Sequence, residues 1–218
     1  MSAVQERQAP TRHAPVVRPA LLRTADALRL VLLAGLAAGI VAGDGKAIVV
    51  LGAGATAALV LRFAMLPAVY DLTVVAALVL QCGGEALGLY DAWGGFDTLV
   101  HVTLPALTAP AAYLALARLE VVRDLRDPHD DLAGRGDVGV FVVTACVGLA
   151  IGGVWELAEG LSDGLAGSSL QESVGDTNRD LLADGIGSML GAAGLVAWSR
   201  LGPGTVARTR DGRELQDA

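Results

Sequence analysis

The sequence predicts an all-α membrane protein, a polytopic bundle of about six transmembrane helices. Of the 218 residues, 53% are hydrophobic, and the mean hydropathy is +0.54. Aromatic residues make up only 4% of the chain, whereas 28 residues are glycine, a composition typical of helices that pack through small side chains in a membrane. Three glycine pairs spaced by four residues predict the closest helix contacts: Gly84/Gly88, Gly148/Gly152 and Gly187/Gly191.

Six apolar segments fit the length of about 17–25 residues that a helix needs to cross a bilayer. They are Ala27–Gly43, Ala47–Met65, Leu72–Tyr90, Thr98–Ala117, Val138–Ala158 and Leu181–Leu201. The first segment also resembles a secretory signal peptide. Because the polar leader before it is long for such a peptide, we expect a retained helix.

The placement of basic residues predicts that both termini lie in the cytoplasm. If the N-terminus is inside, all Lys and Arg residues except Lys46 and Arg179 fall in inside regions or at the inside end of the first segment. This asymmetry follows the positive-inside rule, and an odd number of spans would break it. We therefore expect a disordered cytoplasmic leader (residues 1–24), a six-helix transmembrane domain (25–201) and a disordered cytoplasmic tail (202–218).

Ionisable residues gather at one depth, near the extracytoplasmic ends of four predicted spans. They are Glu85 in the third span, Asp97 and His101 in the fourth, Glu156 and Glu159 in the fifth, and Asp180 and Asp184 at the start of the sixth. Residues three or four apart share a helix face. Because an ionisable side chain inside a span costs about 2.5–3.5 kcal/mol, it normally faces the bundle interior. The pattern predicts one acidic pocket that opens to the outside.

Such a pocket needs charge compensation, because two carboxylates about 4 Å apart repel by about 4 kcal/mol at an effective dielectric constant of 20. Protons, a cation or intervening water can supply it. Carboxylates with one imidazole suit a divalent metal ion such as Mg, Mn, Ca or Zn, whose identity the sequence does not specify. We expect the metal ligands to be Asp97, Glu156, Glu159 and Asp184, and the catalytic residues to be His101 and Glu156.

Several of these residues also have structural interpretations. Thr177 and Asp180 have the spacing of a capping box, so Asp180 is either a helix cap or a site residue, with Asp176 or Thr177 as the N-cap. His101 and Asp97 are either a local hydrogen-bonded pair or part of the pocket. The aromatic residues Tyr90, Trp93 and Trp155 are expected to anchor the outer membrane interface.

Three linked blocks resemble the YjdF-like bacterial inner-membrane proteins: "EALGLYDAWGGFDTLVH", "VWELAEG" and "LQESVGDTNRDLLADGIGSMLG". A more distant resemblance is to VanZ-like proteins. The resemblance covers roughly residues 70–200. It implies a multi-pass protein of the bacterial cytoplasmic (inner) membrane, and it implies no reaction. It adds Gln171 and Asp176 to Glu85 and Asp180 as further candidate site residues.

Three classes of function stay open. The first is a metal-dependent membrane enzyme that acts on a lipid or cell-envelope headgroup. The second is an accessory or scaffold membrane protein, and the third is a small proton- or cation-coupled transporter. Because the acids all lie in the outer half, a site on one side is favoured over an alternating-access path. A net charge of -7 without a basic aromatic stripe argues against nucleic acid. The expected partners are membrane lipids, with a second copy or another membrane protein left open.

Overall fold

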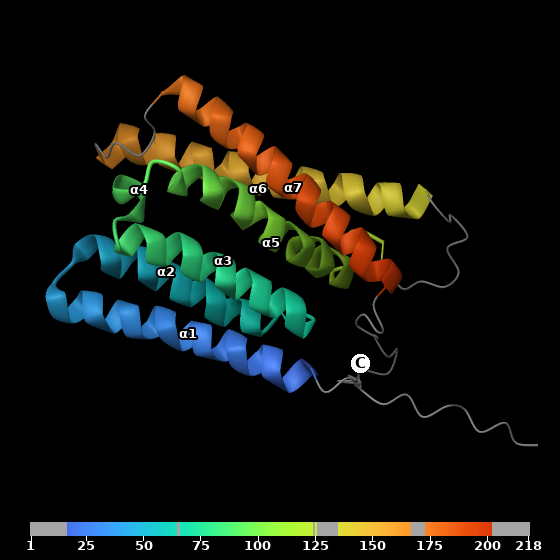
Figure 1. Ribbon diagram of the computed structural model, residues 1–218, viewed down its shortest axis with the longest axis horizontal. Helices are drawn as coiled ribbons and strands as arrows, with labels where there is room; N and C mark the ends of the chain where they lie inside the picture. The colour runs from blue at the N-terminus through green and yellow to red at the C-terminus, as the bar shows by residue number, and fades with distance from the viewer. Residues whose placement is uncertain (1–16, 65, 124, 126–134, 167–172, 202–218) are drawn as a thin grey trace, which may run out of the picture.

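The computed structural model describes residues 17–64, 66–123, 125, 135–166 and 173–201. In these ranges the chain forms seven helices and no strand: α1 (Val17–Ala42), α2 (Gly45–Arg62), α3 (Ala68–Ala86), α4 (Leu89–Ala92), α5 (Phe96–Arg118), α6 (Arg135–Ala166) and α7 (Val174–Leu201) (Figure 1). All but α4 are long and apolar enough to span a membrane. The predicted all-α bundle with six spans is confirmed.

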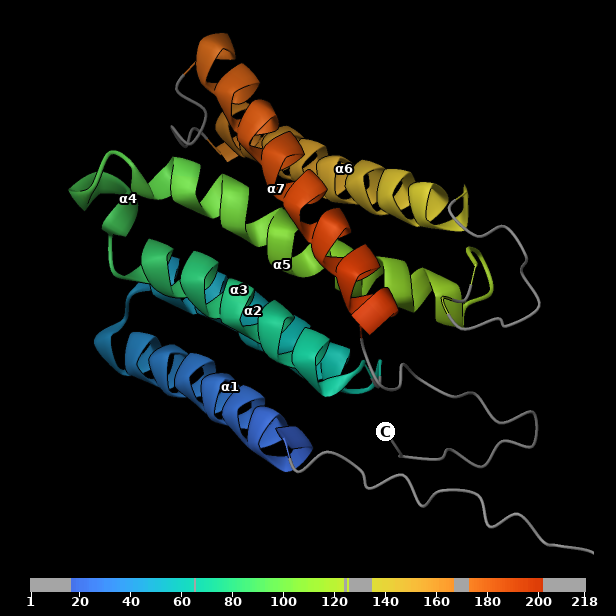
Figure 2. The same cartoon turned by 45° about the vertical axis from the view of Figure 1, so that its right-hand side comes forward.

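The helices form two groups of three. In the first group α1, α2 and α3 pack on one another, and in the second α5, α6 and α7 do so; the contact of α3 with α5 joins the groups. The start of α1 and the end of α7 lie at the same end of the bundle (Figures 1 and 2), which we call the terminal end. The short helix α4 lies at the opposite, distal end.

Several helix ends differ from the predicted ones because caps and turns, which hydropathy ignores, decide them. The helix α1 already begins at Val17, so residues 17–24 are helical and do not belong to a disordered leader. The third span ends at Ala86, since Gly88 adopts a left-handed conformation (φ 68°) that turns the chain into α4. Tyr90 therefore belongs to α4. Residues 1–16 and the tail 202–218 lie outside the described residues.

Glycines bring the helices of the second group close together. A side chain at Gly187 or Gly191 of α7 would collide with the backbone carbonyls of Val102 or Ala106 in α5. On α6, Gly148 lies against Ser188 and Gly152 against Asp184. These two predicted pairs are therefore contact sites. The third pair behaves differently: Gly84 makes room for the ring of Phe96, whereas Gly88 forms the turn before α4.

The first group contains a buried ion pair that the sequence analysis missed. Arg29 of α1, which we assigned to the cytoplasmic arginines, is 5% exposed and donates from both terminal nitrogens to Asp71 of α3. Its Nη1 also donates to Asp26 (2.9 Å), and its Nε donates to the carbonyl oxygen of Ala58 in α2 (3.1 Å). Arg29 thus links all three helices with its hydrogen-bonding groups satisfied.

Candidate functional site

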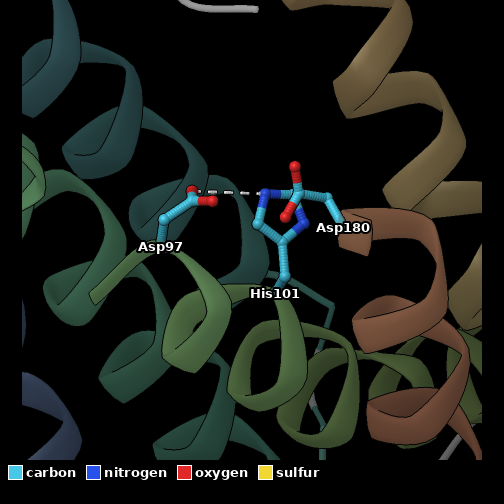
Figure 3. A group of neighbouring side chains, drawn as sticks. All are labelled: Asp97, His101 and Asp180. Carbon is cyan, nitrogen blue, oxygen red and sulfur yellow. Dashed lines mark ion pairs between the residues drawn. The ribbon is translucent and has the colours of Figure 1, made fainter. Parts of the chain in front are cut away.

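His101 is the centre of a polar cluster in the second group of helices. It lies one turn after Asp97 on α5, on the same face, and its Nε2 is 3.5 Å from Asp97 Oδ1 (Figure 3). Its Nδ1 is 3.1 Å from Asp184 Oδ1 on α7, and its Nε2 is 3.7 Å from Glu156 Oε1 on α6. Three helices therefore contribute ionisable groups to one imidazole ring.

The carboxylates around His101 are deeply buried. Asp184 is 2% exposed, Asp180 4% and Glu156 5%. Asp180 and Asp184 are one turn apart on α7, and Figure 3 shows Asp180 reaching the His101 ring from a different helix than Asp97 does. We call these five residues the His101 cluster: Asp97, His101, Glu156, Asp180 and Asp184.

Two sets of three residues in the His101 cluster bring their ligand atoms close enough together to hold a metal ion. In the outer set, Asp97, His101 and Asp180 each offer one ligand atom, and these atoms lie within 4.8 Å of one another. In the inner set, His101, Glu156 and Asp184 do the same. Glu156 Oε1, Asp180 Oδ1 and Asp184 Oδ2 are buried and have no hydrogen-bond partner among the described residues. Buried oxygens of this kind normally have a partner, so these three are available to a cation or a proton.

Three other predicted site residues have partners outside the cluster. Glu85 forms an ion pair with Lys46 of α2 (2.6 Å), and Glu159 accepts a hydrogen bond from Trp155 Nε1 (2.7 Å). Asp176 pairs with Arg179, three residues later on α7 (2.9 Å). The fourth, Gln171, lies outside the described residues.

Asp180 is not a helix cap. The helix α7 begins at Val174, and Ser173 Oγ accepts a hydrogen bond from the backbone N–H of Asp176 (3.2 Å), as an N-cap does. Asp180 lies inside the helix with its side chain buried. Likewise, α6 continues to Ala166, so Glu156 lies well inside it and not at its end.

A small cavity lies beside His101. Its polar lining is Gln81 of α3, His101 and Asp184, together with the Trp155 indole. The hydroxyl of Tyr90 donates to Gln81 Oε1 (2.6 Å). Tyr90 therefore points inward, whereas Trp93 and Trp155 are exposed as interface anchors are expected to be. Gln81 lies one turn before Glu85, so helical spacing in the sequence places it on the same face of α3 as Glu85.

One sequence motif is excluded as a site by its structural context. Gly160 to Gly164 reads Gly-x-Ser-x-Gly, the pattern of a nucleophile elbow in hydrolases. That elbow requires a strand-to-helix turn, whereas this stretch lies within α6.

Six apolar helices and a buried imidazole surrounded by carboxylates define a multi-pass membrane protein with a polar site inside its helix bundle. The chain belongs to the family of predicted membrane proteins named DUF2238, whose family model matches residues 25–200. The YjdF-like proteins are part of this family, so the resemblance seen in the sequence is confirmed. Neither a curated protein nor a solved structure matches the chain.

Proposed function

We propose that the His101 cluster binds a divalent cation and that the protein is a metal-dependent enzyme acting on a lipid or cell-envelope headgroup. The observation that carries the proposal is the set of three buried carboxylate oxygens that accept no hydrogen bond from the described residues, one each on Glu156, Asp180 and Asp184. All three belong to residues that approach the same imidazole. An unpaired buried charge is costly, and a cation among these oxygens removes that cost.

The charge balance of the cluster supports a bound cation. Four carboxylates surround one imidazole, so even a protonated His101 leaves most of their negative charge uncompensated. Carboxylates this close repel strongly in a medium of low dielectric constant. Protonation of some of the carboxylates would also reduce the negative charge. A test of metal binding must therefore distinguish a bound cation from bound protons.

The orientation of His101 also suits a metal ligand. Its Nδ1 is hydrogen-bonded to Asp184 Oδ1 (3.1 Å), which fixes the ring and leaves Nε2 as the ligand atom. The Nε2 atom faces Asp97 and Glu156 at 3.5 and 3.7 Å. One imidazole nitrogen with carboxylate oxygens is a ligand set for Mg, Mn or Zn, and a bound cation of this type polarises a phosphoryl or acyl oxygen.

The depth of the cluster supports a substrate at the membrane interface. His101 lies in the second turn of α5, which begins next to α4 at the distal end, and the exposed indole of Trp155 lies beside it. Tryptophans are enriched at the level of lipid headgroups. The distribution of basic residues supports the proposal that this end faces the outside of a bacterial cytoplasmic membrane.

Metal analysis and thermal unfolding of the purified protein in detergent test the proposal. We expect bound metal in the wild type and a rise in Tm with one of Mg²⁺, Mn²⁺ or Zn²⁺, because a ligand at 100 times its Kd adds about 2.7 kcal/mol of stability. Glu156→Gln should lose this rise. Glu159→Gln is the matched control one turn away on α6, whose carboxylate accepts from Trp155. If no divalent ion shifts the wild type and chelation changes nothing, the metal proposal is wrong.

A second candidate, a proton- or cation-coupled carrier, is favoured by one observation. Buried hydroxyls continue from the cluster towards the middle of the bundle: Ser188 lies one turn after Asp184 on α7, and Thr144 is buried on α6. The Ser188 hydroxyl has no partner among the described side chains. Cation- or proton-driven uptake into liposomes that carry the protein distinguishes this role from that of an enzyme. An accessory role is what remains if neither metal binding nor flux is found.

A further inference from the structure

The Gln81 amide is held in one orientation by a residue of another helix. Tyr90 of α4 donates its hydroxyl hydrogen to Gln81 Oε1 at 2.6 Å, and its ring packs edge-on against Phe96 (centroids 4.9 Å apart). Phe96 in turn fills the space that Gly84 leaves open. Burial raises the pKa of the Tyr90 phenol, so the hydroxyl remains a donor. These contacts fix which way the amide of Gln81 points.

The fixed amide lines the cavity beside the His101 cluster. Gln81 is 7% exposed, and its Nε2 donates to none of the described residues. Across the cavity lie His101 and Asp184, two members of the inner set, and the Oδ2 atom of Asp184 has no partner either. The cavity volume of ≈ 10 Å³ is about the room of one water molecule.

We propose that Gln81, oriented by Tyr90, is a positioning residue of the cation site and donates a hydrogen bond to the single oxygen ligand that the cavity accepts. This inference rests on the proposed function, because the oxygen ligand is that of a cation held by the His101 cluster. The ligand is a water or hydroxide, or the oxygen of a substrate that replaces it. The Gln81 amide is its donor, and His101 and Asp184 lie beside it in the lining of the cavity.

The remaining walls of the cavity strengthen this contact. They are mostly apolar and include Val100, Leu104, Pro105 and Ile151. They leave no room for a second solvent shell, and a hydrogen bond is stronger in such surroundings than in water. Gln81 belongs to α3 of the first group of helices, whereas His101 and Asp184 belong to the second group. The cavity is therefore lined by both groups, at the place where α3 packs on α5.

Fluoride binding to the Mn²⁺-loaded protein tests the proposal, because fluoride replaces a metal-bound water and accepts a hydrogen bond from the same donor. The readout is the Mn²⁺ electron paramagnetic resonance spectrum during a fluoride titration in detergent, with chloride as the anion control. Gln81→Met keeps the shape of the side chain and removes the amide. We expect the fluoride Kd to rise about tenfold, which corresponds to about 1.4 kcal/mol, while the Mn²⁺ Kd changes less than about threefold.

Tyrosine variants give a second, independent test. Tyr90→Phe releases the Gln81 amide, so the fluoride Kd should rise about threefold, whereas Mn²⁺ binding stays as in the wild type. Tyr70→Phe is the matched control, because it removes a hydroxyl from the core at the other end of α3. Fluoride binding equal to wild type in Gln81→Met, or in Tyr90→Phe if Gln81→Met does not fold, overturns the inference. A wild type that binds no Mn²⁺ overturns the proposed function instead, and this inference with it.

Discussion

Gly152 of α6 lies directly against the carboxylate of Asp184 on α7. A methyl group at Gly152 would overlap the side chain of Asp184, including Oδ2 and Cγ. The same carboxylate is hydrogen-bonded to His101 through Oδ1 (3.1 Å). Because Gly152 has no side chain, Asp184 of α7 can approach α6 and hold the His101 ring. The packing of α6 on α7 and the geometry of the site therefore both depend on the contact between Gly152 and Asp184.

We predict that Gly152→Ala abolishes the Tm increase caused by divalent ions, because Asp184 has to move away from His101. Gly153→Ala is the control on the next residue, where an added methyl group meets nothing within 4 Å. It should bind metal as the wild type does. Equal metal-dependent stabilisation in both variants would show that the placement of Asp184 is unimportant to the site.

The Arg29–Asp71 pair should be essential to the first group of helices. Asp71→Asn removes the buried counter-charge of Arg29 and leaves it only the half-exposed carboxylate of Asp26, so we expect a loss of about 3–5 kcal/mol and a lower Tm in detergent. The exchange of the two residues, Arg29→Asp with Asp71→Arg, should recover part of that loss. A single variant as stable as the wild type would contradict the role of the pair.

Glu85→Gln should leave metal binding unchanged and alter stability by less than about 1 kcal/mol. Its carboxylate is 17% exposed but pairs with Lys46, whose side chain is 57% exposed, so water screens the pair and its contribution is small. A titration with Mn²⁺ checks this, with Glu156→Gln measured in parallel. If Glu85→Gln weakened Mn²⁺ binding as much as Glu156→Gln, Glu85 would belong to the His101 cluster.

The orientation of the chain is tested by reporter fusions. A reporter fused after Arg213 should be cytoplasmic, and one inserted near Ser168 should be extracytoplasmic, because basic residues crowd the terminal end. Activity of the reporter pair alkaline phosphatase and green fluorescent protein distinguishes the sides. An extracytoplasmic C-terminus would place the His101 cluster on the cytoplasmic side.

Hydropathy alone predicted the six spans, because the length of an apolar run is the main requirement for crossing a bilayer. It did not predict where helices end. The left-handed Gly88 and the cap at Ser173 decide that locally, and the second of these turned Asp180 from a supposed cap into a buried group of α7.

Helical spacing also predicted which acids share a face, such as Asp180 with Asp184, but it did not predict how each helix is rotated about its axis. That rotation is set by contacts between distant segments. Lys46 of α2 forms an ion pair with Glu85, and the missing side chain of Gly152 leaves room for Asp184 next to His101. The ion pair of Arg29 was missed for the same reason, since its partner Asp71 is on another helix. The inward turn of Tyr90 depends on α4, which the sequence analysis merged with the third span.

The most direct test of a cation site on His101 is an equilibrium titration of the purified protein with Mn²⁺, in which electron paramagnetic resonance measures the free ion. We predict saturable binding of about one ion per chain in the wild type, because His101 belongs to both sets of ligands. His101→Gln should lose it while the protein remains folded. Wild-type protein that binds no Mn²⁺, or a His101→Gln variant that binds it equally well, would contradict the account.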